Sequence, residues 1–153
     1  MRVATCAAIA VVWVTAIALR AQVASPPVFT QQQVDAGRAA YAKNCAECHM
    51  PDLSGNNEKP PLAGETFMGT WSDRTTKDLL DYMSGAMPFG GPSLEADTYL
   101  SLTAYILHSN GAAAGSAALT ALTAARIGSL PCAAPSAKSL ERVCAAVRDV
   151  GSN

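Results

Sequence analysis

The stretch Cys45-Ala46-Glu47-Cys48-His49 places two thiols two residues apart and a histidine directly after the second thiol. This C-x-x-C-H spacing is typical of covalent attachment of a c-type haem. Two thiols at this spacing reach the two vinyl groups of a porphyrin, and the adjacent histidine lies under the iron. The stretch therefore predicts one covalently bound haem c, attached through Cys45 and Cys48, with His49 as a ligand of the iron.

Other chemistry of paired cysteines fits the sequence less well. A zinc knuckle would need a second pair of ligands at metal spacing, and Cys132 and Cys144 are too far apart in the sequence to supply one. A thioredoxin-like redox pair would need a βαβ frame, and no stretch of the sequence alternates as a strand. The sequence therefore favours haem attachment over a zinc knuckle or a thioredoxin-like redox pair.

A helix is predicted directly before the motif. Thr30 begins a capping-box pattern, and the helix that it starts should end just before Cys45. Val34, Gly37 and Tyr41 follow one another at helical spacing and form a single stripe on that helix. Glycine costs stability inside a helix, but it is tolerated where a second helix must cross closely. Gly37 is therefore expected to mark such a crossing.

After the motif, residues 50–65 are rich in proline, glycine and asparagine and predict a long functional loop. A second helix is expected over residues 75–84, ended by Gly85, and a third over residues 96–110. The expected buried side of the second helix comprises Leu79, Leu80, Tyr82 and Met83. These patterns predict an all-α fold, with about three main helices and long loops around one covalent haem.

The second axial ligand decides whether the iron carries electrons or does chemistry, because an open position can bind oxygen or peroxide. The candidates are Met50, Met68, Met83, Met87 and His108. Met50 is adjacent to His49 and cannot reach the other face of the haem. Met83 lies within a predicted helix, where a methionine is usually a core residue. Met87 lies in a loop stiffened by prolines, which can hold a weak thioether on iron, so Met87 is the predicted ligand.

The first residues of the chain predict export. A basic start and an uncharged run over residues 3–19 precede Ala21 and Ala24, so residues 1–21 are expected to be a signal peptide, with cleavage after Ala21 or Ala24. An uncleaved membrane anchor is the alternative, since 17 residues are just enough to span a membrane. The predicted location is the periplasm, and the chain would contact a membrane only if this segment stayed uncleaved.

Charge is unevenly distributed. Removal of residues 1–21 leaves 9 basic and 12 acidic side chains, a net charge of −3, and no basic patch typical of nucleic-acid binding is visible. Residues 28–111 hold 5 basic and 10 acidic side chains, whereas residues 112–153 hold 4 basic and 2 acidic ones. An acidic body is therefore followed by a basic tail.

Residues 112–153 are rich in alanine and predict an appended tail of unknown role, either helical or partly disordered. The tail contains Cys132 and Cys144. In an oxidising compartment these two cysteines could form a disulfide, and two free thiols are the alternative.

Residues 28–111 resemble the class I cytochromes c, especially the monohaem cytochromes found with quinoprotein alcohol dehydrogenases. Besides the haem-attachment motif, the resemblance rests on an ordered set of shorter segments. These are Gly37, Tyr41, residues 52–55, residues 60–64, Phe67, Trp71, residues 74–75, residues 78–79, residues 81–82, residues 87–88 and residues 104–107. The resemblance implies a cytochrome c domain over residues 28–111, in which the first and last helices cross near Gly37.

The resemblance also implies roles for individual residues. His49 and Met87 would be the axial ligands, and the carbonyl of Pro60 would accept a hydrogen bond from the other ring nitrogen of His49. A shift of one residue in the alignment would give that role to Pro61. Trp71 and Arg74 would lie near the haem propionates, although they could equally be a packing tryptophan and a surface arginine.

The predicted function is electron transfer without turnover of a substrate, so the chain is not expected to be an enzyme. A periplasmic dehydrogenase would donate electrons, and a terminal oxidase or another cytochrome would accept them. Two alternatives stay open. One is a cytochrome subunit held permanently on a quinoprotein dehydrogenase by the tail, and the other is a haem enzyme or gas sensor with an open sixth position.

Overall fold

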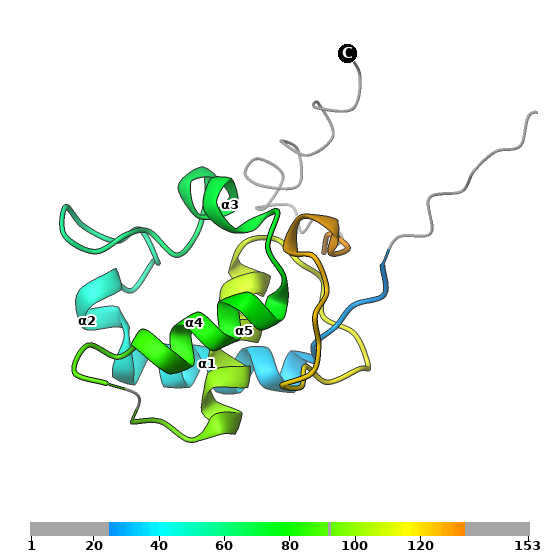
Figure 1. Ribbon diagram of the computed structural model, residues 1–153, viewed down its shortest axis with the longest axis horizontal. Coiled ribbons are helices and arrows are strands. Elements are labelled where there is room, and N and C mark those ends of the chain that lie inside the picture. Colours follow the sequence, from blue (N-terminus) through cyan, green and yellow to red (C-terminus); the bar gives the residue numbers. More distant parts are fainter. Residues whose placement is uncertain (1–24, 92, 134–153) are drawn as a thin grey trace, which may run out of the picture.

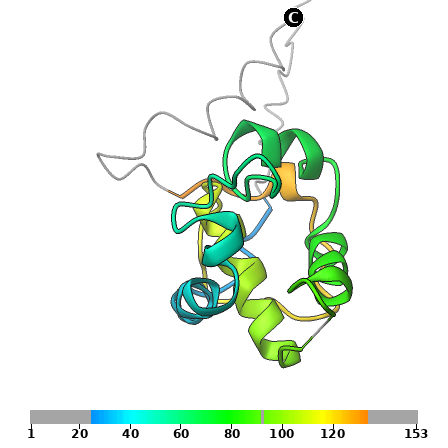
Figure 2. The ribbon, with the colours of Figure 1, turned by 90° about the vertical axis from the view of Figure 1, so that its left-hand side faces the viewer.

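The computed structural model describes residues 25–91 and 93–133. Within these residues the chain forms α-helices, one 3₁₀ helix and isolated β-bridges but no strand, which confirms the all-α prediction. The elements are α1 (Gln31–Asn44), α2 (Ala46–His49), α3 (Glu65–Trp71), α4 (Thr76–Ala86), α5 (Ala96–Ser109) and η1 (Ile127–Ser129). Figure 2 shows α1, α3, α4 and α5, which Figure 1 labels, arranged in a ring.

The close crossing of α1 and α5 is at the centre of the fold. Thr30 caps α1 with the predicted capping box, and the predicted stripe of Val34, Gly37 and Tyr41 is buried. A Cβ atom on Gly37 would lie 1.9 Å from the backbone oxygen of Ser101 on α5. Only glycine permits this approach, so the expectation that Gly37 marks a helix crossing is confirmed.

Helix α4 begins as predicted but ends later. Thr75 and Asp78 form a capping box at its start, and its buried residues include Leu79, Leu80 and Met83. The helix passes through Gly85 to Ala86, so the predicted stop at Gly85 is wrong. Tyr82 is 53% exposed, which corrects its assignment to the buried side. Glycine only weakens a helix, and here the following turn is still hydrogen-bonded, with Met87 N donating to Met83 O.

Helix α3 was not predicted from the sequence. It begins after Gly64, whose φ of 89° turns the chain out of the long loop, and it buries only Phe67. A helix of seven residues with one buried side chain gives no helical period in the sequence. Its first residue, Glu65, also falls within the loop expected over residues 50–65.

Asn110 joins the end of α5 to this loop, although the predicted third helix included it. The helix ends at Ser109, and Asn110 is its buried C-cap residue. The side-chain amide of Asn110 donates to Leu62 O at 2.9 Å, and its side-chain oxygen accepts from Gly64 N at 3.0 Å. A buried amide that uses both of its functions in this way fixes the loop before α3 against α5.

The tail expected after residue 111 is irregular over residues 112–133, apart from η1, and so is not the predicted helix. It packs against the helices, because Leu119 and Ile127 are 2% and 4% exposed. Residues 134–153 and the predicted signal peptide lie outside the described residues. Within the described part of the chain no helix is long and apolar enough to cross a membrane. The limits of the predicted domain and the tail's role stay predictions.

Replacement of Gly37 by alanine should disrupt the helix crossing. We expect Gly37→Ala to lower the free energy of unfolding by about 1–3 kcal/mol or more, because the new methyl group overlaps the backbone of Ser101. Urea unfolding measures the effect. The control is Gly85→Ala in α4, where an added Cβ meets nothing within 4 Å and should stabilise by at most about 1 kcal/mol. Equal effects of the two substitutions would contradict a close crossing.

The cap of α4 should make stability depend on pH. Hydrogen bonds from the Thr75 backbone and side chain lower the pKa of Asp78 below its ordinary value. The unfolded chain then binds the proton more readily, so the contribution of Asp78 is present above its ordinary pKa and is lost as the pH falls. Urea unfolding between about pH 3 and 7 measures the effect. We expect the free energy of unfolding to fall less steeply toward acid pH in Asp78→Asn than in the wild type. An unchanged slope in Asp78→Asn would contradict a role of this cap in the pH dependence.

Candidate functional site

The C-x-x-C-H motif forms a tight turn at the end of α1. Cys45 is both the C-cap of α1 and the N-cap of α2, so His49 lies one short helix beyond α1. The buried hydroxyl of Tyr41 donates to Met50 O at 2.7 Å and lies 3.2 Å from His49 O. Met50 has a φ of 64°, a conformation that costs energy in a residue other than glycine. The hydrogen bond from Tyr41 therefore holds a strained turn directly after the histidine.

The ring of His49 is held in one orientation. The side chain is 7% exposed, and its Nδ1 lies 2.9 Å from the carbonyl oxygen of Pro60. A carbonyl oxygen can only accept, so Nδ1 must carry the proton and Nε2 presents its lone pair. This is the hydrogen bond that the resemblance implied for Pro60, and it involves Pro60 and not Pro61. A histidine whose second nitrogen donates to a carbonyl is typical of a metal ligand.

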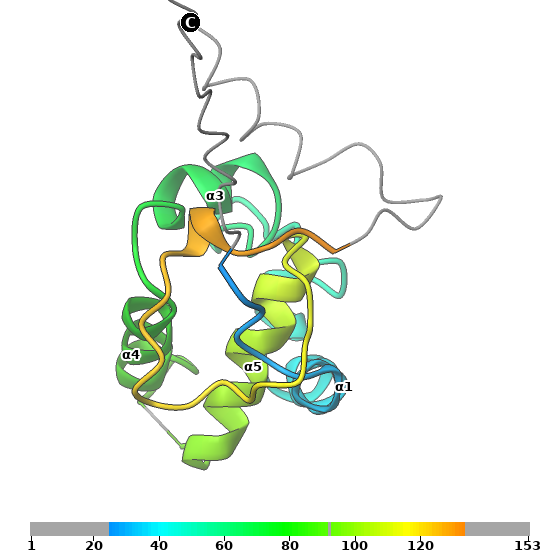
Figure 3. The ribbon, with the colours of Figure 1, turned by 90° about the vertical axis from the view of Figure 1, so that its right-hand side faces the viewer.

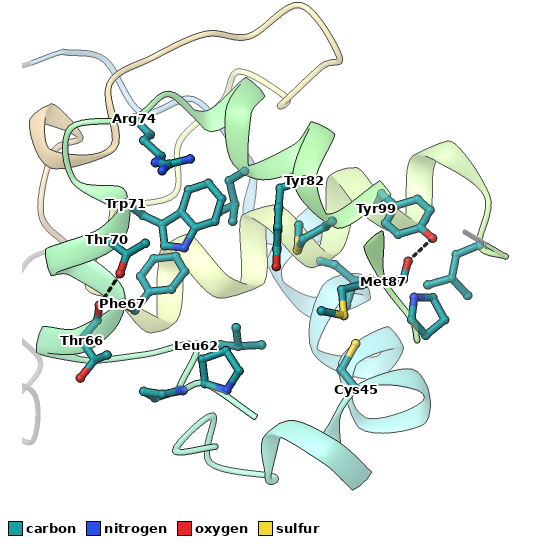
Figure 4. Close-up of a pocket in the computed structure, with 17 residues that line it drawn as sticks. Cys45, Leu62, Thr66, Phe67, Thr70, Trp71, Arg74, Tyr82, Met87 and Tyr99 are labelled. Carbon is teal, nitrogen blue, oxygen red and sulfur yellow. Dashed lines mark hydrogen bonds between the residues drawn. The ribbon is translucent and has the colours of Figure 1, made fainter. Parts of the chain in front are cut away.

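A mainly apolar cavity of about 290 Å³ lies beside this turn. Its volume is near the lower end of the roughly 300–1,000 Å³ usual for cofactor sites. The lining residues come from the motif, the long loop, α3, α4 and α5, and Figure 4 shows them. They are Cys45, Pro60, Pro61, Leu62, Thr66, Phe67, Thr70, Trp71, Arg74, Leu79, Tyr82, Met83, Met87, Pro88, Leu94, Tyr99 and Leu102. His49 is not a lining residue, but its hydrogen-bond partner Pro60 is.

Met87 lines the cavity at the end of α4. Its side chain and that of Cys45 point toward one another in Figure 4. The hydroxyl of Tyr99 on α5 donates to Met87 O at 2.6 Å, which fixes the backbone at this position. Of the other candidate ligands only Met83 lines the cavity, whereas Met50, Met68 and His108 do not. The structure therefore brings the predicted ligand Met87 to the same cavity as Cys45.

Trp71 and Arg74 lie at the other end of the cavity from Cys45, as Figure 4 shows. The Trp71 ring packs between Phe67 and Tyr82, with centroid distances of 6.2 and 5.5 Å. The guanidinium of Arg74 lies 5.1 Å from the centroid of the Trp71 ring. An aromatic wall with a cation on it gives this end of the cavity a partly polar character.

Several lining residues were not predicted as site residues. Tyr99 lies on α5, and Thr66 and Thr70 lie on α3, the helix that the sequence did not predict. Their spacing on α3 places both threonines on one side of a helix, but this signal is visible only once the helix is known.

The cysteines differ in state. Cys45 and Cys48 are free thiols, Cys48 is exposed, and burial raises the pKa of Cys45, with a smaller effect from Cys48. Cys132 is disulfide-bonded, so the alternative of a free thiol there is wrong. Its predicted partner, Cys144, lies outside the described residues. The described residues also contain no cluster of three or more His, Cys, Asp or Glu side chains that could hold a bare metal ion.

These residues fit a c-type haem. Two free thiols, one of them on the cavity wall, stand beside a histidine whose Nε2 presents its lone pair. The apolar lining suits a porphyrin, and the cation at the far end suits carboxylate groups.

A comparison with protein families agrees with this fit. Residues 32–106 match the family model described as "Cytochrome C oxidase, cbb3-type, subunit III". The chain is also similar to the sulfane dehydrogenase SoxCD from Paracoccus pantotrophus, with 31% sequence identity and a TM-score of 0.46. That similarity covers 64% of this chain and 52% of the other, so the chain spans about half the length of the protein that it matches. No curated protein matches the chain. The finer resemblance to cytochromes of quinoprotein alcohol dehydrogenases stays a prediction.

Loss of the Tyr41 hydroxyl should weaken the strained turn after His49. We expect Tyr41→Phe to lower the free energy of unfolding by about 1–3 kcal/mol, because the Met50 carbonyl loses its donor. The matched control is Tyr105→Phe on α5, since the two rings pack at 5.3 Å but no hydrogen bond within the described residues uses the Tyr105 hydroxyl. Urea unfolding of both variants tests this, and an equal loss in Tyr105→Phe would contradict it.

Proposed function

We propose that this chain is a c-type cytochrome, a one-electron carrier with one haem c ligated by His49 and Met87, and the family match over residues 32–106 supports this. The observation that carries the proposal is the hydrogen bond of 2.9 Å between His49 Nδ1 and Pro60 O. It orients the histidine beside two free thiols at the edge of an apolar cavity. Neither a zinc knuckle nor a thioredoxin-like redox pair needs an oriented histidine and two thiols beside an apolar cavity.

When bound, the haem supplies a ferric/ferrous couple, and ligation by histidine and methionine raises its potential. The residues of this chain hold the site and exclude water. Tyr41 fixes the turn that carries His49, and Tyr99 fixes the backbone of Met87. Because both ligand-bearing segments are anchored by hydrogen bonds to α1 and α5, oxidation and reduction need little rearrangement. Small rearrangement favours an electron carrier over an enzyme that must open a coordination position.

The proposed setting is the periplasm, with a dehydrogenase as electron donor and a terminal oxidase or another cytochrome as acceptor. The export signal predicted over residues 1–21 supports this location, because such a signal directs a chain out of the cytoplasm. Residues 28–111 carry twice as many acidic as basic side chains, which favours a basic docking surface on each partner. Higher salt would weaken that docking.

Absorption spectra test the axial ligand. The full chain, expressed with a haem-attachment system, should show a c-type spectrum with the weak thioether-to-iron band of the ferric state. We expect Met87→Ala to lose this band and to bind carbon monoxide when reduced, because the thioether is the sixth ligand. The control is Met68→Ala, since Met68 is a partly buried methionine that does not line the cavity.

The outcomes separate the possible functions. If the wild type lacks the band, the sixth position is open or held by another residue, and if it also binds carbon monoxide freely, a haem enzyme or gas sensor becomes the better interpretation. If Met68→Ala loses the band while Met87→Ala keeps it, the ligand assignment is wrong although haem attachment stands. If no covalent haem forms, the proposed function fails altogether.

A further inference from the structure

Residues 112–133, which we call the strap, leave the end of α5 and return to it. Ala112 pairs with Cys132 in an antiparallel bridge. On either side of this bridge, Ala113 N donates to Pro131 O at 2.7 Å, and Ala133 N donates to Gly111 O at 2.9 Å. Figure 3 shows the strap running from this point past α1, then past α4, and back to η1 beside α3. Both ends of the strap are thus fixed at one place.

The first part of the strap joins α1 to α4. The side chain of Gln33 donates to Leu119 O and accepts from Leu119 N, both at 2.9 Å. Further on, the Thr76 hydroxyl donates to Thr123 O at 2.7 Å, and Thr76 N donates to Ala125 O at 2.8 Å. The strap therefore contacts the first turn of both helices with paired hydrogen bonds.

The last part of the strap contacts the turn between α3 and α4, residue by residue. Gly128 N donates to Ser72 O at 2.8 Å, and Ile127 N donates to Arg74 O at 2.9 Å. Asp73, which lies between Ser72 and Arg74, forms an exposed ion pair with Arg126 of the strap. Ile127 is buried and anchors this part of the strap in the core. The backbone of residues 72–74 is therefore held at both of its ends.

This turn carries two side chains of the cavity. Trp71 directly precedes it, Arg74 ends it, and both line the cavity, whereas no residue of the strap does. The approach is close, because a Cβ atom on Gly128 would lie 2.9 Å from Ser72 O and 3.2 Å from Ser72 Cβ. A side chain at position 128 would push the turn away and move Trp71 and Arg74 with it.

We propose that the strap is a positioning element that holds Trp71 and Arg74 against the cavity, and that it thereby helps to set the reduction potential of the haem. The inference rests on the proposed function. The charge and polarity of the surroundings tune the potential of a haem iron, and Arg74 is the cation of the cavity lining. The strap acts on the iron only through these two side chains.

Gly128→Ala tests the proposal on the full, haem-loaded chain. The ferrous-to-ferric ratio is measured in a redox buffer poised at the midpoint of the wild type. We expect Gly128→Ala to change this ratio about threefold, equivalent to about 28 mV, because a tenfold change is 59 mV for a one-electron couple. The matched control is Gly69→Ala on α3, where an added Cβ meets nothing within 4 Å, and its ratio should equal that of the wild type.

Hydrogen exchange supplies a second measurement on the same samples. Faster exchange at Thr76 and Ile127 in Gly128→Ala, together with the changed ratio, supports the proposal. Faster exchange with an unchanged ratio overturns it, because the strap is then only structural. No change in either measurement also overturns it, since the close contact with Ser72 would be absent.

Ile127→Val replaces Gly128→Ala if that variant does not fold, because loss of one buried methyl group is a milder change in the same contact. We expect Ile127→Val to change the ferrous-to-ferric ratio less than about threefold, again with faster exchange at Thr76. An unchanged ratio in Ile127→Val would then overturn the proposal. A chain that carries covalent haem but shows no change of ratio refutes this inference alone, whereas a chain without covalent haem refutes the proposed function.

Discussion

The backbone contact between α1 and α5 at Gly37 is the constraint on which the rest of the structure depends. It brings Tyr41, one turn further along α1, against Tyr105 of α5 at 5.3 Å. From this position the Tyr41 hydroxyl reaches the turn that follows His49. The helix crossing therefore helps to place the haem-attachment motif, whose own sequence supplies the chemistry.

Helix α5 then sets the distance across the cavity. Tyr99 near its start holds the backbone of Met87, and Asn110 at its end holds the loop before α3. Two segments that line one cavity are thus attached to the two ends of one helix. A helix is stiff over this length, so the walls cannot move independently as they could if each belonged to a free loop. Such stiffness suits the proposed electron transfer, in which the charge of the haem changes but its surroundings stay in place.

Sequence patterns predicted the parts of the fold that depend on local chemistry. The capping box at Thr30, the buried stripe of α1 and the glycine at the crossing are all readable from spacing. The resemblance to cytochromes c added the contact of His49 with Pro60. Helix α3 and the packing of the strap could not be predicted, because one buries a single side chain and the other is held by backbone hydrogen bonds, which leave no period in the sequence.

The strap also bears on where the folded unit ends. Thr76 is 1% exposed, and its hydroxyl and its backbone N–H both donate to oxygens of the strap. A chain cut at residue 111 would lose both of these hydrogen bonds. It would also uncover the side of the core that Leu119 and Ile127 close. Residues 112–133 therefore pack on the helices and bond to them, although the family match ends at residue 106.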